Sequence, residues 1–205
     1  MKINETDLKW AYGLTPRSLT SHLIIHHAAG EGSVEAIHNY HLSRGWAGIA
    51  YHYYVRRDGS VYRGRPENMQ GGHTTNWNWC SIGICFEGNF ENEQMSDAQK
   101  KTGAELVADI VSRYPSIVVG KHSQYGATSC PGKNFPFDEI VYGTGSEPED
   151  NAEETEEPDA WAKADCEWSV ESGLFLGDGN GRFRWRDSVS RQELAVLLRR
   201  FEQMK

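Results

Sequence analysis

The sequence predicts an α/β fold, a central mixed β-sheet flanked by helices, followed by a small all-α helix-loop-helix module. Three observations predict it. Short β-branched apolar runs alternate with amphipathic helical segments through residues 1–142. Residues 143–159 are acidic and contain Pro, Gly and Ser, which is typical of a solvated linker. Residues 160–205 show helical periodicity on both sides of a Gly-rich loop. Strands that alternate with helices in one chain form a layered α/β architecture.

The first half of the predicted sheet comes from three segments. Residues 22–29, HLIIHHAA, are an apolar, β-branched run that predicts a buried strand. Residues 31–45 carry apolar side chains at helical spacing and end in Gly45, a common C-terminal stop. Residues 49–65 predict two strands around an Asp58-Gly59 turn, because Asp-Gly between alternating apolar residues favours a hairpin.

The second half continues the alternation. Residues 81–90, SIGICFEGNF, predict another strand. Residues 96–114 predict an amphipathic helix with Ser96 as N-cap and Leu106, Ile110 and Val111 facing inward. Residues 116–120, SIVVG, predict the last strand. That strand leads directly into the segment GKHSQYGATSCPG.

The charge distribution excludes nucleic acid as a partner. The formal net charge of −8 is accounted for by residues 143–159, which hold eight Asp and Glu and no Lys or Arg. The part before them carries 13 basic and 14 acidic residues, and the part after them 8 and 7. Neither part has the basic balance of a nucleic-acid-binding domain. No apolar run approaches the roughly 20 residues of a membrane-spanning helix, so we expect no membrane partner.

The start of the chain and its cysteines indicate where the protein works. The segment MKINETDLKWAYG lacks the apolar core of a secretion signal, so we expect no signal peptide and release from the cytoplasm by another route. Four cysteines are too few for a disulfide-built fold of this length, and we expect reduced thiols.

His122 and Cys130 are the first candidates for chemistry. They lie eight positions apart across the loop that follows the last predicted strand, so they could hold one metal ion. Thiolate and imidazole suit zinc and do not suit magnesium or calcium. A Cys–His nucleophile and two unrelated core residues are the alternatives. A third ligand would be His26 or His27; neighbouring strand residues point to opposite faces, and periodicity does not say which one faces the metal.

Four motifs in order carry a resemblance to a known family: LIIHHAAG, GWAGIAYHYYVRRDGSVYRGR, GGHTTNWNWCSIGICFEGNF and GKHSQYGATSCPG. Together they resemble the zinc-dependent N-acetylmuramoyl-L-alanine amidases of the amidase-2 family, to which the peptidoglycan recognition proteins also belong. The resemblance covers roughly residues 18 to 140. It implies a zinc amidase catalytic domain over residues 1–142, in which zinc-activated water cleaves the amide between the lactyl group of N-acetylmuramic acid and L-alanine.

The resemblance also implies roles for single residues. His26, His122 and Cys130 become the ligands of one Zn²⁺ ion, and His27 faces away. Tyr51 reaches the catalytic water or the developing oxyanion. Many relatives carry a Lys two positions before the cysteine, where this sequence has Thr128, so a hydrogen-bond donor without charge takes that place.

Three further residues come from the same motifs. His73 matches a position that lines the substrate groove, and Asn76 is assigned to that groove with it. Glu87 is the nearby carboxylate considered as general base, although a structural hydrogen bond is the favoured interpretation for it.

Residues 160–205 resemble a single S-layer homology module, with a Trp-Ala start, SGLFLGDGNGRF and SRQE as markers. Such modules bind secondary cell-wall polymers and usually occur in three copies. A lone copy implies a solitary wall binder or a module that self-associates, and a stabilising helical appendage is the plain alternative.

The sequence as a whole is therefore interpreted as a peptidoglycan hydrolase of the phage or prophage endolysin kind. Such a protein accumulates in the host cytoplasm until lysis and then acts on the cell wall. A host autolysin and a non-catalytic peptidoglycan-binding protein are the alternatives.

Overall fold

The computed structural model describes residues 1–142, 158, 162–175, 183, 185 and 191–204. The chain divides into two compact units, Met1–Ser146 and Glu147–Lys205. Each unit is described by itself. None of the helices in the described part of the chain is long and apolar enough to cross a membrane.

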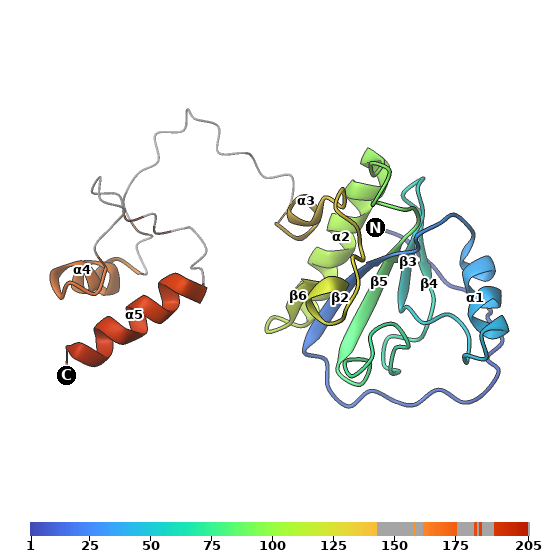
Figure 1. Ribbon diagram of the computed structural model, residues 1–205, viewed down its shortest axis with the longest axis horizontal. Coiled ribbons are helices and arrows are strands. Elements are labelled where there is room, and N and C mark those ends of the chain that lie inside the picture. The colour runs from blue at the N-terminus through green and yellow to red at the C-terminus, as the bar shows by residue number, and fades with distance from the viewer. Residues whose placement is uncertain (143–157, 159–161, 176–182, 184, 186–190, 205) are drawn as a thin grey trace. The chain divides into compact units, whose positions relative to one another are not determined.

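The first unit is built on one six-stranded mixed sheet (Figure 1), which confirms the predicted fold class. The strand order is β1-β4-β3-β5-β2-β6. Only the β3–β4 pair is antiparallel, and the other neighbours run parallel. The strands are β1 (Ile3–Asn4), β2 (His22–His27), β3 (Tyr53–Val55), β4 (Val61–Arg63), β5 (Ser81–Phe86) and β6 (Val118–Lys121).

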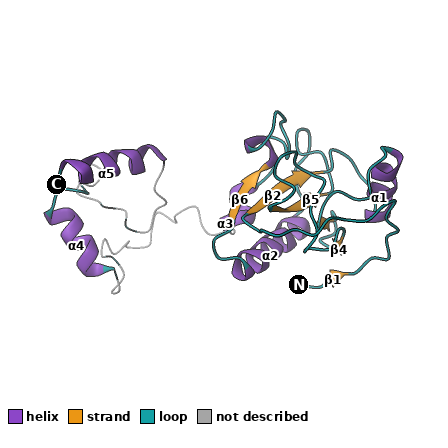
Figure 2. Cartoon of the chain, turned by 90° about the horizontal axis from the view of Figure 1, so that it is seen from below, coloured by secondary structure: helices purple, strands orange, loops and turns teal. Residues whose placement is uncertain are grey.

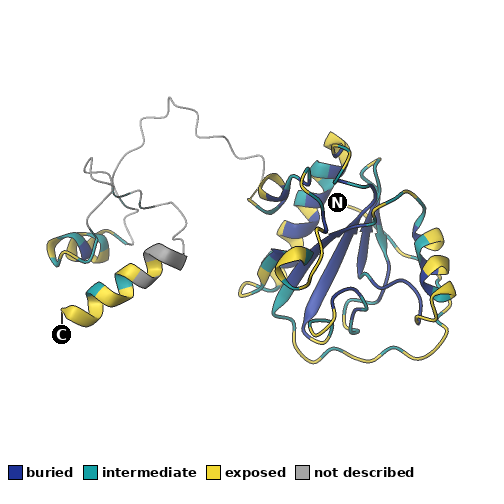
Figure 3. Cartoon of the chain, in the orientation of Figure 1, coloured by how far each residue is buried: buried dark blue, intermediate teal, exposed yellow. Residues whose placement is uncertain are grey.

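Helices cover both faces of this sheet (Figure 2). On one face, α2 (Asp97–Arg113) packs Leu106, Val107 and Ile110 against the strands. On the other face, α1 (Val34–Ser43) contributes to a smaller apolar cluster with Tyr54 of β3. Because both faces of the sheet are covered, β5 is buried along its whole length (Figure 3). Strands in such a position have mostly apolar sequences.

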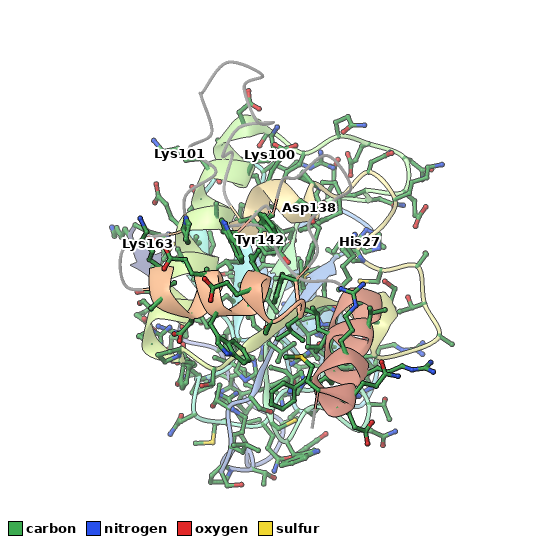
Figure 4. The ribbon with its side chains drawn as sticks, turned by 90° about the vertical axis from the view of Figure 1, so that its left-hand side faces the viewer. His27, Lys100, Lys101, Asp138, Tyr142 and Lys163 are labelled. Carbon is green, nitrogen blue, oxygen red and sulfur yellow. The ribbon has the colours of Figure 1, made fainter. Side chains whose placement is uncertain are left out.

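The short helix α3 (Phe137–Tyr142) lies beside α2, as Figure 4 shows around Lys100, Asp138 and Tyr142. The Lys100 ammonium is 3.1 Å from the Glu139 carboxylate. The pair is largely exposed and contributes little by itself. The apolar side of α3 contributes more to stability, because Phe137 and Ile140 are buried in the same core as α2.

Local sequence signals predicted where the main helices and turns lie. Ser96 accepts a hydrogen bond from the Gln99 amide at 3.2 Å, as the predicted N-cap of α2. Gly59 has a φ of 82° in the β3–β4 turn, and Gly45 a φ of 79° after α1. The strand predicted over residues 81–90 is shorter, since β5 ends at Phe86 and Gly88 takes a φ of 129°.

Two elements and one helix face differ from the prediction. The strand β1 has two residues, too few for a periodic signal, and only its pairing with β4 defines it. The helix α3 was not predicted from the sequence either. The inward face of α2 is wider than predicted: Val107 is fully buried in the core, and Val111, which was predicted to face inward, is partly buried against it.

In the second unit the structure describes two helices, α4 (Lys163–Glu171) and α5 (Arg191–Gln203). Most of the predicted Gly-rich loop, residues 176–182, and Trp161 lie outside the described residues. Apolar side chains of α5 remain exposed in this unit, with Leu198 60% and Phe201 45% accessible.

Candidate metal centre

The candidate site lies at the edge of the sheet where parallel strands β2 and β6 end. His26 is the next-to-last residue of β2, and His122 follows β6 directly as the first residue of the short helix η1 (His122–Gln124). Parallel strands bring their carboxyl ends to one edge, which is the usual position of sites in α/β sheets. The register of β2 and β6 thus brings two histidines together that are far apart in sequence.

His26, His122 and Cys130 offer three ligand atoms that all lie within 4.8 Å of one another. The His26 Nδ1 atom is 3.8 Å from the Cys130 sulfur, and the rings of His26 and His122 have centroids 4.4 Å apart. Zinc lies about 2.0–2.1 Å from nitrogen and about 2.3 Å from sulfur, so two ligands of one tetrahedral ion are about 3.5 Å apart. The geometry and the donor set both fit one zinc ion.

Burial acts in opposite ways on the two kinds of candidate ligand, since it suits the two imidazoles to cation binding and disfavours ionisation of the thiol. Burial lowers the pKa of His26 well below its ordinary value, and the neighbouring His122 and His27 add to this. Burial lowers the pKa of His122 too. Both imidazoles are therefore neutral near pH 7 and keep lone pairs to donate. Burial raises the pKa of the Cys130 thiol to about 11, while the hydrogen bond from the His27 amide opposes the rise. A bound cation is what would hold this thiol as the thiolate ligand.

His27 lies on the opposite face of β2 from His26 and is labelled in Figure 4. Its Nδ1 accepts a hydrogen bond from the Phe90 amide at 3.2 Å. The structure therefore places His26, and not His27, with His122 and Cys130, as the resemblance implied.

The Pro-Gly that follows Cys130 has a packing reason. A Cβ on Gly132 would lie 2.5 Å from the Phe90 carbonyl carbon and 2.6 Å from the Glu91 amide nitrogen. Gly132 also has a φ of 100°, which side chains disfavour. Only glycine lets the cysteine loop sit against the loop after β5, and this contact sets the position of Cys130.

We predict that Gly132→Ala lowers the free energy of unfolding by about 1–3 kcal/mol, because strained backbone is added to a backbone clash. Denaturant unfolding of the whole chain measures it. Gly13→Ala is the matched control: nothing lies within 4 Å of its added Cβ, so its change stays within about 0.5 kcal/mol. Equal stability of the two variants would show that the loop absorbs the methyl group.

Tyr51 and Thr128 flank the three ligands. The Tyr51 ring centroid is 5.2 Å from that of His26. Burial, with Cys85 and Cys130 nearby, raises the pKa of the Tyr51 hydroxyl well above its ordinary value, so the group stays protonated and able to donate. Thr128 lies exposed on the loop, and its hydroxyl accepts a hydrogen bond from the Cys130 amide at 3.2 Å.

The structure gives His73 a different place from the predicted one. His73 is only 8% exposed, and its Nδ1 lies 2.9 Å from the His26 Nε2. Both ring nitrogens contact protein groups, so the predicted role of lining a substrate groove does not fit this position. The physical reason is that the His73 ring points into the protein interior and lies against His26. Asn76 is exposed on a turn, with a φ of 69°.

Asn78 has a structural role at the site that was not predicted from the sequence. Its Oδ1 accepts hydrogen bonds from the amides of His73 and Thr74, at 2.8 and 2.9 Å. A single carboxamide thus shapes the loop that brings His73 to His26. An Asn among Trp residues carries no clear sequence signal for such a role.

Glu87 is held by structural contacts. It accepts hydrogen bonds from Arg56 at 2.6 Å, from the Arg57 amide at 3.1 Å and from the Gly32 amide at 2.9 Å. Burial raises its pKa, but these donors hold the pKa below its ordinary value. Both oxygens are committed, which agrees with a structural interpretation.

Comparison with known proteins decides the family. The profile of the Amidase_2 family, described as N-acetylmuramoyl-L-alanine amidase, matches residues 16–133. This span is more than half of the chain. The chain belongs to the N-acetylmuramoyl-L-alanine amidase family.

Relatives of this amidase-family chain include a peptidoglycan-recognition protein, a phage endolysin and a solved amidase. Peptidoglycan-recognition protein SC2 of Drosophila simulans is 39% identical over 131 residues, which are 58% of this chain and 71% of that protein. An endolysin of Enterobacteria phage T3 is 30% identical over 125 residues, 57% of this chain and 83% of the phage protein. The solved N-acetylmuramoyl-L-alanine amidase LysC from Clostridium intestinale is 36% identical, with a TM-score of 0.67, and covers 69% of this chain and 96% of its own.

Proposed function

We propose that this protein is a zinc-dependent N-acetylmuramoyl-L-alanine amidase that cleaves the bond between the lactyl group of N-acetylmuramic acid and L-alanine in peptidoglycan. The observation that carries the proposal is the convergence of His26, His122 and Cys130 on one point at the carboxyl edge of the sheet. Membership of the amidase family and similarity to a phage endolysin support it.

One zinc ion would be held by these three side chains and would supply Lewis-acid polarisation of the amide carbonyl and a water of pKa about 7. Three protein ligands leave a fourth position open, as in catalytic rather than structural zinc sites.

Tyr51 donates a hydrogen bond to the oxygen that becomes charged in the tetrahedral intermediate. Its hydroxyl stays protonated at neutral pH, and its ring lies beside His26. Donors fixed in advance where charge develops contribute most to catalysis. Thr128 is the second donor, from the loop that carries Cys130. Asn76 contacts the substrate from its exposed turn.

The domain assignment forms part of the proposal. Residues 1–142 are the catalytic domain, residues 143–159 an acidic linker and residues 160–205 a wall-binding module that resembles an S-layer homology unit. Exposed apolar side chains on α5, among them Leu194, Leu198 and Phe201, support contact with a secondary cell-wall polymer or with a second copy of the module. We further propose that the protein stays in the host cytoplasm until release and then acts on the wall, as a phage or prophage endolysin would.

Digestion of purified peptidoglycan tests the reaction. The protein is incubated with the wall material with and without a chelator, and the products are analysed by mass spectrometry. We expect free stem peptides that begin with L-alanine, absent after chelation and restored by added zinc. Pelleting of the protein with the wall in the presence of chelator measures binding separately.

A non-catalytic peptidoglycan binder is the second candidate, because several relatives are peptidoglycan-recognition proteins and Thr128 brings no positive charge. Tight pelleting with intact muropeptides in the presence of zinc would favour this candidate and overturn the amidase proposal. Products cut within the glycan or within the stem would overturn the bond assignment alone.

A further inference from the structure

The two ring nitrogens of His26 face different partners. The Nδ1 atom lies 3.8 Å from the Cys130 sulfur, on the side of the proposed metal. The Nε2 atom lies 2.9 Å from the Nδ1 of His73, which comes from the loop before β5. A histidine can present a lone pair to a metal at Nδ1 only if its proton sits on Nε2. Whether His26 can present a lone pair at Nδ1 therefore depends on whether its Nε2 donates the hydrogen bond to His73 or accepts it.

Contacts behind His73 determine that direction. The Ser81 hydroxyl lies 2.7 Å from the Trp77 carbonyl, which can only accept, so the hydroxyl proton points there. The Ser81 oxygen is then free to accept from the His73 Nε2, at 3.4 Å. With its proton on Nε2, neutral His73 has a lone pair on Nδ1, and that lone pair accepts the His26 Nε2–H.

The contacts of Thr74 agree with the same tautomers, in which His26 and His73 each carry the proton on Nε2. Its hydroxyl lies 3.0 Å from the His73 Nδ1 and 3.4 Å from the His26 Nε2. The hydroxyl can accept from His26 and donate to His73, so both the direct and the bridged contact leave the lone pair of His26 on Nδ1.

The His73 ring sits in a slot that two glycines leave open. A Cβ on Gly71 would lie 2.3 Å from the ring, and one on Gly83, in β5, would lie 2.6 Å from it. The Asn78 side chain accepts a hydrogen bond from the backbone amide of His73 and so fixes its backbone. The chain therefore leaves out two side chains to bring this imidazole against His26.

We propose that His73 is a positioning residue that fixes the tautomer and orientation of His26, so that Nδ1 of His26 is the metal-binding nitrogen. The inference rests on the proposed function. Groups that hold a ligating histidine through its second nitrogen affect metal affinity about 10–100-fold when removed.

The test measures zinc affinity by competition with a chromophoric chelator, at fixed pH, for the whole chain. We expect His73→Ala to raise the zinc dissociation constant about 10–100-fold. His73→Asn places an amide oxygen near the former Nδ1 and should restore most of the affinity. His73→Gln, whose amide reaches the position of Nε2 instead, should not. The visible spectrum of the cobalt-substituted protein should change in His73→Ala and return in His73→Asn.

Ser81→Ala is the second variant, because it leaves the ring in its slot if His73→Ala fails to fold. We expect about a tenfold weaker zinc affinity for it, and no change for Ser112→Ala, an exposed serine on α2. Zinc affinity at the wild-type value in Ser81→Ala and in every folded His73 variant would overturn the inference alone. A wild-type chain that binds no zinc would overturn the proposed function and this inference together.

Discussion

Cys130→Ala is expected to remove bound zinc and amidase activity together. The substitution takes away the one thiolate of the site and leaves two neutral imidazoles, His26 and His122, which hold a divalent ion far less tightly. Without the cation, water keeps its ordinary pKa and the amide carbonyl is not polarised. We expect the rate to fall at least about a thousandfold, since a loss of several kcal/mol in transition-state stabilisation corresponds to three powers of ten. Metal content by elemental analysis and release of stem peptides measure the two losses.

Two further variants sharpen this prediction. His122→Ala should give the same double loss, because it removes another of the three ligands. Cys80→Ala is the matched control, since Cys80 is also buried but does not belong to the group. It should keep zinc and rate. Full activity in Cys130→Ala would show that the metal assignment is wrong.

Tyr51→Phe is expected to separate the metal from the chemistry. The substitution removes one hydroxyl and keeps the ring that lies against His26. Zinc content should therefore remain at the wild-type level. The rate should fall about 10²–10³-fold, which is the usual effect of removing one donor from a developing oxyanion. Zinc content and kcat, measured on the same preparation, check both halves.

Tyr142→Phe is the control for Tyr51→Phe, because Tyr142 is an exposed tyrosine on α3 and is not among the three ligands or their neighbours described above. It should leave zinc and rate unchanged. A Tyr51→Phe variant with normal kcat would assign this tyrosine to packing, and one without zinc would give it a part in holding the metal ligands.

The larger elements could be predicted from sequence because their signals are local. Ser96 caps α2, Gly59 lies in the turn of the hairpin, and the apolar residues 82–86 form most of β5. The strand β1 could not be predicted, because a two-residue strand exists only through its pairing with β4. Val107 joins the core beside the partly buried Val111 for a similar reason: the exact rotation of a helix is set by the sheet on which it packs.

The candidate ligands could also be predicted from the sequence, because their motifs occur in the order of a known family. The order of the motifs, by its resemblance to the amidase-2 family, predicted that one His of a pair, a second His after a strand and a Cys across a loop belong together, and the folded chain does bring His26, His122 and Cys130 together. The choice between His26 and His27 from periodicity alone was impossible, since alternation gives two faces without saying which is which. The tertiary structure decided it, because His122 and Cys130 lie on the side of β2 to which His26 points, while His27 contacts the Phe90 amide.

The tertiary structure alone decided what surrounds His73 and Glu87. His73 turns inward because Gly71 and Gly83 leave space for its ring, and two glycines 12 positions apart carry no signal of that slot. Glu87 accepts hydrogen bonds from three donors on two separate segments, which leaves both of its oxygens committed to the fold. The chemical type of each side chain follows from the sequence. Which of its lone pairs remain free depends on neighbours that only folding brings within hydrogen-bond distance.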